Sequence, residues 1–160
     1  MIFVTVGALF GFDRLIRLVD ELAPRFPDQE FMAQIGNGDY VPKNMKYARS
    51  LSAAEYRETV GRSRLLVAHA GMGSIISALE NRCGVVLLPR RANLGEHTTD
   101  HQEQTARWVE GKPGVFVAWE DADLFPAIEK ALLAERLEDS LPTTAPAAFL
   151  QRITAYIESL

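Results

Sequence analysis

The segment Leu65-Leu66-Val67-Ala68-His69-Ala70-Gly71-Met72-Gly73-Ser74-Ile75 joins an apolar run to a helix-like run through a turn spaced by two glycines. A strand that leads through such a turn into a helix presents free backbone N–H groups and the positive end of the helix dipole. The segment therefore predicts a binding site for an anion, most simply a phosphate. Glycine turns also occur without a ligand, and a histidine in this place is often structural, so both interpretations stay open. The candidate ligand-binding residues of this turn are His69, Gly71, Met72, Gly73 and Ser74.

Strand and helix signals alternate along the whole chain. Apolar, β-rich runs predict strands at residues 2–6, 30–35, 47–49, 64–68, 84–88 and 115–118. Helical spacing and capping residues predict helices after Asp13, after Ser52, over 75–81, from Thr99 or Asp100 to Val109, and over 124–133. This alternation predicts an α/β fold, namely a Rossmann-like parallel sheet with helices on both faces.

Three loops, which begin at Gly7, His69 and Pro89, follow predicted strands at their carboxyl ends. In parallel sheets ligands bind beyond this edge. The third loop leads into a polar cluster at residues 95–102, where Asp100 and Gln102 can hydrogen-bond neighbouring hydroxyl groups. The sequence therefore predicts a ligand that combines a phosphate with a hydroxylated group.

The polar cluster also allows other interpretations. His97 and His101 are four residues apart, a spacing that suits a metal site on a helix, with Glu96 and Asp100 beside them. Residues 98–100 look like a helix start, which would leave His97 in the preceding loop, so we expect no metal. The pair Arg90-Arg91 can meet a sugar carboxylate, face solvent or contact a partner.

Composition excludes several classes of protein. The chain has 160 residues, 48% hydrophobic and 24% charged, with a formal net charge of −4, so we expect no nucleic-acid partner. A single cysteine, Cys83, excludes an internal disulfide framework and favours a buried thiol. No Gly-x-Ser-x-Gly nucleophile motif is present. Without a signal-peptide pattern or a long apolar run, a cytoplasmic location is expected.

The C-terminal part differs in character from the rest. We expect the sheet domain to span residues 1–134 and a proline-containing linker to span 135–146. Residues 147–160 repeat apolar side chains at helical spacing, which predicts an amphipathic helix. This helix can dock on a partner or pack on the sheet of its own domain, and both alternatives stay open.

Taken together, four motifs resemble the glycosyltransferase family 28 C-terminal domain, and the resemblance runs from Met1 to about Ala134. It is strongest to the stand-alone subunits of bacterial exopolysaccharide synthesis and extends to the cytosolic half of the eukaryotic two-part N-acetylglucosaminyltransferase. Relatives commonly carry a ribose-binding glutamate at the position of Ser77, where this sequence departs from them. The motifs are Val4-Thr5-Val6-Gly7, Phe12-Asp13-x-Leu15-Ile16, His69-Ala70-Gly71-x-Gly73-Ser74 and Asp100-His101-Gln102.

The resemblance implies the donor-binding half of a GT-B glycosyltransferase, and the length of the chain suits one of two such domains. It implies inverting, metal-independent transfer of glucuronic acid, glucose or N-acetylglucosamine from a UDP-sugar to a lipid-linked glycan. The acceptor would be held by a membrane-anchored partner subunit, which would keep this chain at the inner face of the plasma membrane. The residues implied to face the donor are Gly7, His69, Gly71, Met72, Gly73, Ser74, Glu96, Asp100, His101 and Gln102.

The catalytic base is expected on the partner, or locally at Glu96 or His97. Two other functions are left open. The chain can be a non-enzymatic subunit that binds nucleotide sugar for regulation or assembly. It can also be a small phosphohydrolase or epimerase, which would turn over its substrate alone.

Overall fold

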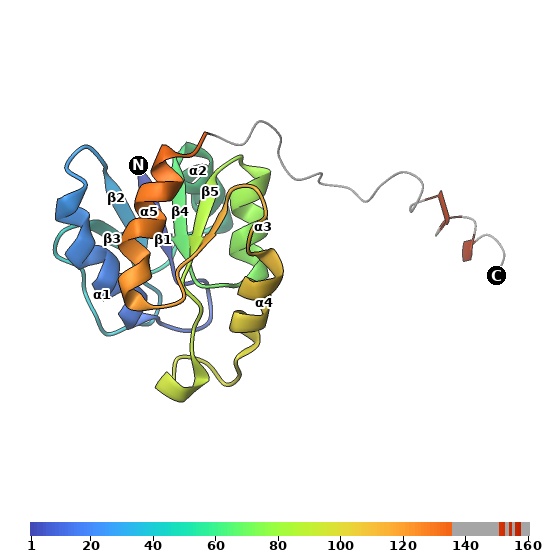
Figure 1. Ribbon diagram of the computed structural model, residues 1–160, viewed down its shortest axis with the longest axis horizontal. Coiled ribbons are helices and arrows are strands. Elements are labelled where there is room, and N and C mark those ends of the chain that lie inside the picture. Colours follow the sequence, from blue (N-terminus) through green and yellow to red (C-terminus); the bar gives the residue numbers. More distant parts are fainter. Residues whose placement is uncertain (136–150, 153, 155, 158–160) are drawn as a thin grey trace.

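The computed structural model describes residues 1–135, 151–152, 154 and 156–157. Its centre is a six-stranded sheet in which every pair of neighbouring strands is parallel, with the order β3-β2-β1-β4-β5-β6 (Figure 1). The order reverses between β1 and β4, which places the topological switch point in the middle of the sheet. This arrangement confirms the predicted Rossmann-like fold.

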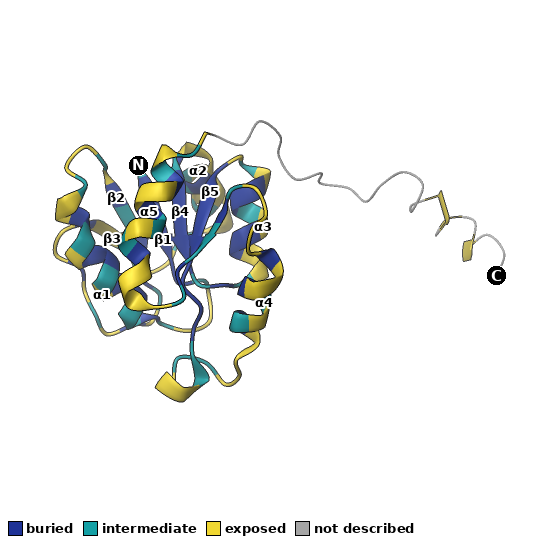
Figure 2. Cartoon of the chain, in the orientation of Figure 1, coloured by how far each residue is buried: buried dark blue, intermediate teal, exposed yellow. Residues whose placement is uncertain are grey.

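All six predicted strands are present; β3 is shifted by one residue, and the other five are slightly shorter than their apolar runs. The inner strands are buried on both faces (Figure 2), as expected for a sheet covered by helices on each side. The strands are β1 (Ile2–Thr5), β2 (Phe31–Gln34), β3 (Lys46–Ala48), β4 (Leu65–Ala68), β5 (Gly84–Leu87) and β6 (Val115–Val117).

The helices divide between the two faces of the sheet. Helices α1 (Asp13–Leu22) and α5 (Leu124–Leu133) pack on one face, in a core that includes Leu15 and Ile128. Helices α2 (Ala53–Arg62), α3 (Met72–Glu80) and α4 (His101–Val109) cover the other face. Cys83 lies in this second core with no exposed surface, which confirms the expected buried thiol.

Two helix starts differ from the prediction. Asp13 is the first residue of α1 and does not cap it; its carboxylate instead accepts a hydrogen bond from the backbone N–H of Asp39. Helix α3 begins at Met72 rather than Ile75, so Met72, Gly73 and Ser74 of the glycine turn form the first turn of the helix. The expected capping box of Ser52 and Glu55 at the start of α2 is present.

Of the predicted linker and C-terminal helix, the structure describes only residue 135 and five scattered positions after 150. The linker and most of the helix therefore lie outside the described residues and stay predictions. Among the residues described, no helix combines the length and the apolar character needed to cross a bilayer.

Candidate functional site

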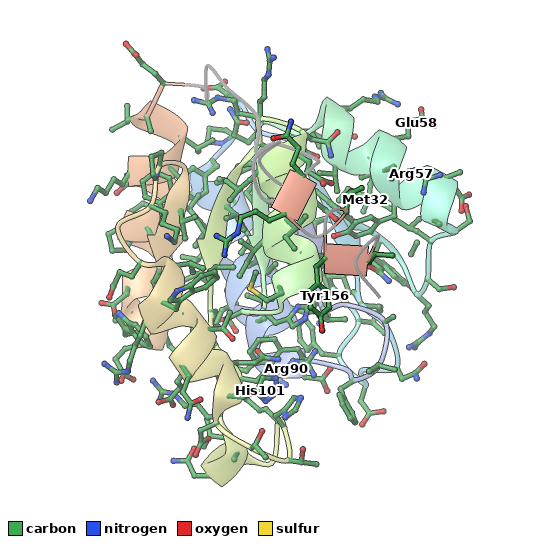
Figure 3. All side chains as sticks on the ribbon, turned by 90° about the vertical axis from the view of Figure 1, so that its right-hand side faces the viewer. Met32, Arg57, Glu58, Arg90, His101 and Tyr156 are labelled. Atoms are coloured by element: carbon green, nitrogen blue, oxygen red, sulfur yellow. The ribbon has the colours of Figure 1, made fainter. Side chains whose placement is uncertain are left out.

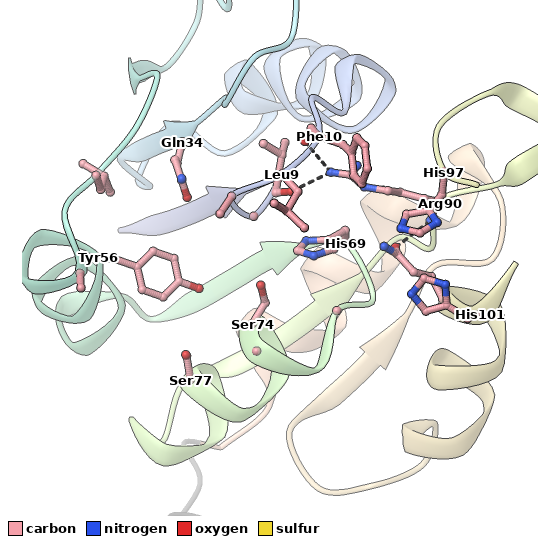
Figure 4. A pocket seen from close by; sticks show the side chains of 18 of the residues that line it. Leu9, Phe10, Gln34, Tyr56, His69, Ser74, Ser77, Arg90, His97 and His101 are labelled. Atoms are coloured by element: carbon pink, nitrogen blue, oxygen red, sulfur yellow. Dashed lines mark hydrogen bonds between the residues drawn. The ribbon is translucent and has the colours of Figure 1, made fainter. Parts of the chain in front are cut away.

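A cavity of about 770 Å³ opens at the carboxyl edge of the sheet. The loops after β1, β4 and β5 and the start of α4 form its walls, together with α2 and α3 (Figure 4). This is the edge at which the sequence placed the three loops beginning at Gly7, His69 and Pro89. The cavity brings together eight of the predicted site residues, which are Gly7, His69, Gly71, Gly73, Ser74, His97, His101 and Gln102.

His69 sits at the end of β4 between two glycines. A Cβ atom added to Gly7 would lie 2.7 Å from Cε1 of the His69 ring, and one added to Gly71 would collide with Nε2. Gly7 also has a φ of +77°, which side chains rarely tolerate. The two glycines are therefore needed to clamp the imidazole in the wall of the cavity.

The pKa of His69 is lowered to about 4, mainly by burial and in part by the positive charge of Arg90, while a contact with the Thr5 backbone opposes the shift. The imidazole is therefore neutral at pH 7. Its Nδ1 atom is buried and has no hydrogen-bond partner in the structure. A neutral imidazole can hydrogen-bond a ligand in the cavity as donor or acceptor, depending on its tautomer.

The N-terminus of α3 meets the cavity beside His69. Gly71 occupies the N-cap position, so no side chain caps the first backbone N–H groups of the helix. A Cβ atom added to Gly73 would find no heavy atom within 4 Å, although Gly73 lines the cavity. The helix end is therefore both uncapped and open, as an anion site at a helix N-terminus requires.

Arg90 lies under the opposite part of the cavity and is 1% exposed. Its Nη2 atom donates to the carbonyl oxygens of Val6 at 2.7 Å and of Phe10 at 2.8 Å (dashed lines in Figure 4). Its guanidinium lies 4.9 Å from the centre of the Phe12 ring. Burial lowers the pKa of Arg90 to about 10, so the side chain stays positively charged at pH 7.

The two remaining histidines close this end of the cavity. His97 precedes α4, as expected, and its ring contacts the ring of His101, the first residue of α4, at a centroid distance of 4.5 Å. Partial desolvation lowers the pKa of His97, and the neighbouring His101 and Arg90 lower it further. Gln102 is buried and accepts a hydrogen bond from the backbone N–H of Arg90. Arg90 and His101 lie at the same end of the molecule (Figure 3).

Three predicted site residues do not line the cavity. The Glu96 carboxylate is held by Arg14, with Nε–Oε1 and Nη2–Oε2 distances of 2.6 and 2.8 Å, and also accepts the backbone N–H of Arg91. Asp100 is the residue before α4, but its carboxylate accepts the backbone N–H of Ala92. Met72 is exposed on α3 outside the lining. The structure therefore places Glu96, Asp100 and Met72 outside the cavity wall, and their assignment to the donor site stays a prediction.

Sequence reasoning missed several residues at the other end of the cavity. Tyr56 and Arg57 come from α2, and Gln34 comes from the end of β2. Burial raises the pKa of Tyr56, and hydrogen bonds with Ser74 and Ser77 oppose that shift. Hydroxyl groups therefore cluster where relatives are expected to carry a glutamate. Gln34 could have been predicted as a site residue, because it lies at the carboxyl end of a predicted strand.

The charges around the cavity are one-sided. All three histidines of the chain line it, together with Arg57 and Arg90. Among the described residues that line the cavity there is no aspartate or glutamate. The chain as a whole carries a net charge of −4, yet the described lining of this cavity has cations and no carboxylate, which favours an anionic ligand.

Solved structures with a similar fold include several glycosyltransferases. The crystal structure of the calicheamicin glycosyltransferase CalG4 is 18% identical with a TM-score of 0.66, over 99% of this chain and 43% of that one. The solution structure of ALG13 is 20% identical with a TM-score of 0.59, over 95% and 94% of the two chains. Os79 from O. sativa, solved in complex with UDP, is 16% identical with a TM-score of 0.61, over 84% and 32%.

The chain thus spans less than half of CalG4 and Os79 but nearly all of ALG13. Comparison with curated proteins gave no match. The fold is the Rossmann-like α/β domain found in GT-B glycosyltransferases. The glycosyltransferase family 28 C-terminal domain matches residues 1–151, and the chain belongs to this family. This match confirms the resemblance noted from the sequence motifs.

Proposed function

We propose that the chain is the donor-binding subunit of a two-component inverting glycosyltransferase that uses a UDP-sugar. The observation that carries this proposal is the open, uncapped N-terminus of α3 in a cavity lined by cations and histidines without a carboxylate. A diphosphate is the part of a nucleotide sugar that such a helix end binds. Membership of glycosyltransferase family 28 gives this anion site its context.

The cavity has room for a sugar and a nucleoside on either side of the diphosphate. With the diphosphate against Gly73 and Ser74, one neighbouring region offers the hydroxyls of Tyr56 and Ser77. We assign this region to the nucleoside. The other region offers His97, His101 and Gln102, which we assign to the sugar. The transferred sugar would be glucuronic acid, glucose or N-acetylglucosamine.

The transfer step follows from this arrangement. The acceptor hydroxyl attacks the anomeric carbon on the face opposite the diphosphate, and the bond from that carbon to the phosphate oxygen breaks. Negative charge then develops on the departing UDP, where the backbone N–H groups and dipole of α3 stabilise it. These groups belong to the chain itself, so the proposal requires no metal and no cofactor.

The acceptor hydroxyl must also lose a proton. His97 is the local candidate for this base, because its lowered pKa keeps the ring neutral at pH 7 and it lines the cavity. Glu96 is not retained, because Arg14 holds its carboxylate. The alternative source of the base is the acceptor-binding subunit, which we expect to be membrane-anchored and to present a lipid-linked glycan. Such a partner would hold this chain at the inner face of the plasma membrane.

Calorimetric titration with UDP and with the three UDP-sugars tests the donor site. We expect saturable UDP binding that the Gly73→Asp variant loses, because a carboxylate at the α3 N-terminus repels the diphosphate. The matched control is Ala54→Asp, which adds the same charge at the second residue of α2, exposed and outside the cavity lining. An acidic residue in the first turn stabilises a helix, so both variants should fold. Equal UDP affinity in all three proteins would refute the site.

A non-enzymatic nucleotide-sugar subunit remains the second candidate, because no carboxylate among the described lining residues is available as a base. The two functions give different results once an acceptor is supplied. A non-enzymatic subunit would bind the donor yet show no sugar transfer even with a partner present.

A further inference from the structure

Arg90 is a buried cation that forms no close ion pair with a carboxylate among the described residues. Its side chain contacts Val6, Phe10 and the backbone oxygen of Glu96, and all of these hydrogen-bond partners are carbonyl groups. The Glu96 carboxylate forms a two-point ion pair with Arg14, and it acts on Arg90 only through space, where its charge partly opposes the lowering of the Arg90 pKa. The Nε atom of Arg90 is buried and has no hydrogen-bond partner. A buried charge in this state is costly unless something else compensates it.

The site around Arg90 indicates what compensates it. Arg90 lines the cavity, and the loop that it binds, residues 7–11, lies over the same cavity. Two carbonyl oxygens of that loop region, at Val6 and Phe10, are tied to one guanidinium nitrogen at 2.7 and 2.8 Å. One side chain therefore combines a structural task with a fixed positive charge at the ligand site.

We propose that Arg90 is a positioning residue of the donor site, which pins the loop of residues 7–11 over the cavity and whose buried charge favours the anionic diphosphate. The inference rests on the proposed function, since it requires that the cavity holds a nucleoside diphosphate. The diphosphate would add to the partial compensation that Glu96 gives the charge of Arg90, whereas the neutral nucleoside gains nothing from this charge. The charge of Arg90 therefore strengthens binding of the diphosphate part of UDP and leaves binding of the uridine part unchanged.

The experiment compares UDP with uridine, because the two differ only in the charged diphosphate. Both are titrated by NMR into wild-type protein and into the Arg90→Gln, Arg90→Lys and Arg91→Gln variants. Arg91 is the matched control, since it changes the net charge equally, does not line the cavity and pairs with Glu120. We expect Arg90→Gln to weaken UDP binding about tenfold to a hundredfold and uridine binding less than about threefold, as for other charge-assisted contacts.

The lysine variant separates the two tasks of Arg90. It keeps the charge but loses the two-carbonyl contact, so its ratio of UDP to uridine affinity should stay within about threefold of the wild-type ratio. Arg91→Gln should leave both affinities unchanged. If Arg90→Gln does not fold, the test rests on Arg90→Lys. A fall of its UDP-to-uridine affinity ratio well below the wild-type ratio would then overturn the proposal.

Two further outcomes are distinguishable. Equal weakening of UDP and uridine by Arg90→Gln would leave Arg90 with a structural role only and overturn this inference while sparing the donor site. A wild-type protein that binds neither UDP nor uridine would overturn the proposed function, and the role of Arg90 with it.

Discussion

At the scale of single residues, the site depends on a neutral histidine held between two glycines. Burial and Arg90 both disfavour the charged form of His69, so the folded protein holds this ring neutral down to a pH of about 4. In an unfolded chain a histidine takes up its proton near pH 6.5. The folded state therefore gains stability from this group above that pH and loses it as the pH falls towards 4.

A variant without this histidine should lose part of the acid sensitivity. Between pH 7 and pH 4.5 the free energy of unfolding of the wild type should fall by about 2 kcal/mol more than that of His69→Gln. Urea unfolding at the two pH values measures the difference, and His101→Gln, at an exposed position, is the control. An NMR titration that finds His69 protonating near pH 6.5 would contradict the expected burial effect.

At the scale of elements, the turn from β4 into α3 carries two glycines with different tasks. Gly71 leaves space for His69, whereas Gly73 faces open space in the lining of the cavity. Only Met72 separates the two glycines, and both lie at the start of α3. A single methyl group added at each glycine therefore separates the packing task from the binding task.

Gly71→Ala should cost about 1–3 kcal/mol of folding free energy, because the new methyl group collides with a ring that Gly7 holds from the other side. Gly73→Ala should keep or raise stability by up to about 1 kcal/mol, since alanine favours the helix and meets no atom. It should nevertheless weaken UDP binding, because the methyl group projects into the cavity. Thermal unfolding and calorimetry together check both variants, and unchanged UDP affinity in Gly73→Ala would argue against the diphosphate position.

At the scale of the whole molecule, two cores on opposite faces fix the sheet, and its carboxyl edge is left for the site. The loops after β1, β4 and β5 converge there because these strands are neighbours in a parallel sheet. Every polar group of the proposed donor site comes from this one domain. Under the proposed function, the acceptor is assigned to a second subunit.

The purified chain should therefore bind a UDP-sugar but form no glycolipid by itself. Incubation with radiolabelled UDP-glucuronate, UDP-glucose or UDP-N-acetylglucosamine and membranes containing the partner should yield labelled lipid with one of the three donors. Membranes from cells lacking this chain serve as the control, and the Gly73→Asp variant should not restore labelling. Transfer to lipid by the isolated chain would contradict the two-component proposal.

The candidate site could be predicted where it depends on local sequence. The turn at His69 to Ser74 and the loops after β1 and β5 were indicated because apolar runs mark strands, and parallel strands end at a common edge. Eight of the predicted residues accordingly line the cavity. Tyr56 and Arg57 could not be predicted, because a helix face shows no local sign of which cavity it will meet.

The sequence by itself determined the order of strands and helices along the chain and the glycine turn between β4 and α3. These features depend on residues that are close together in the sequence. The tertiary structure decided how the polar side chains are used. Arg14 reaches Glu96 across 82 positions of the chain and removes it from the site, and Arg90 reaches Val6 across 84. Such pairings depend on the packing of distant segments, because charge and hydrogen bonding act through space rather than along the chain.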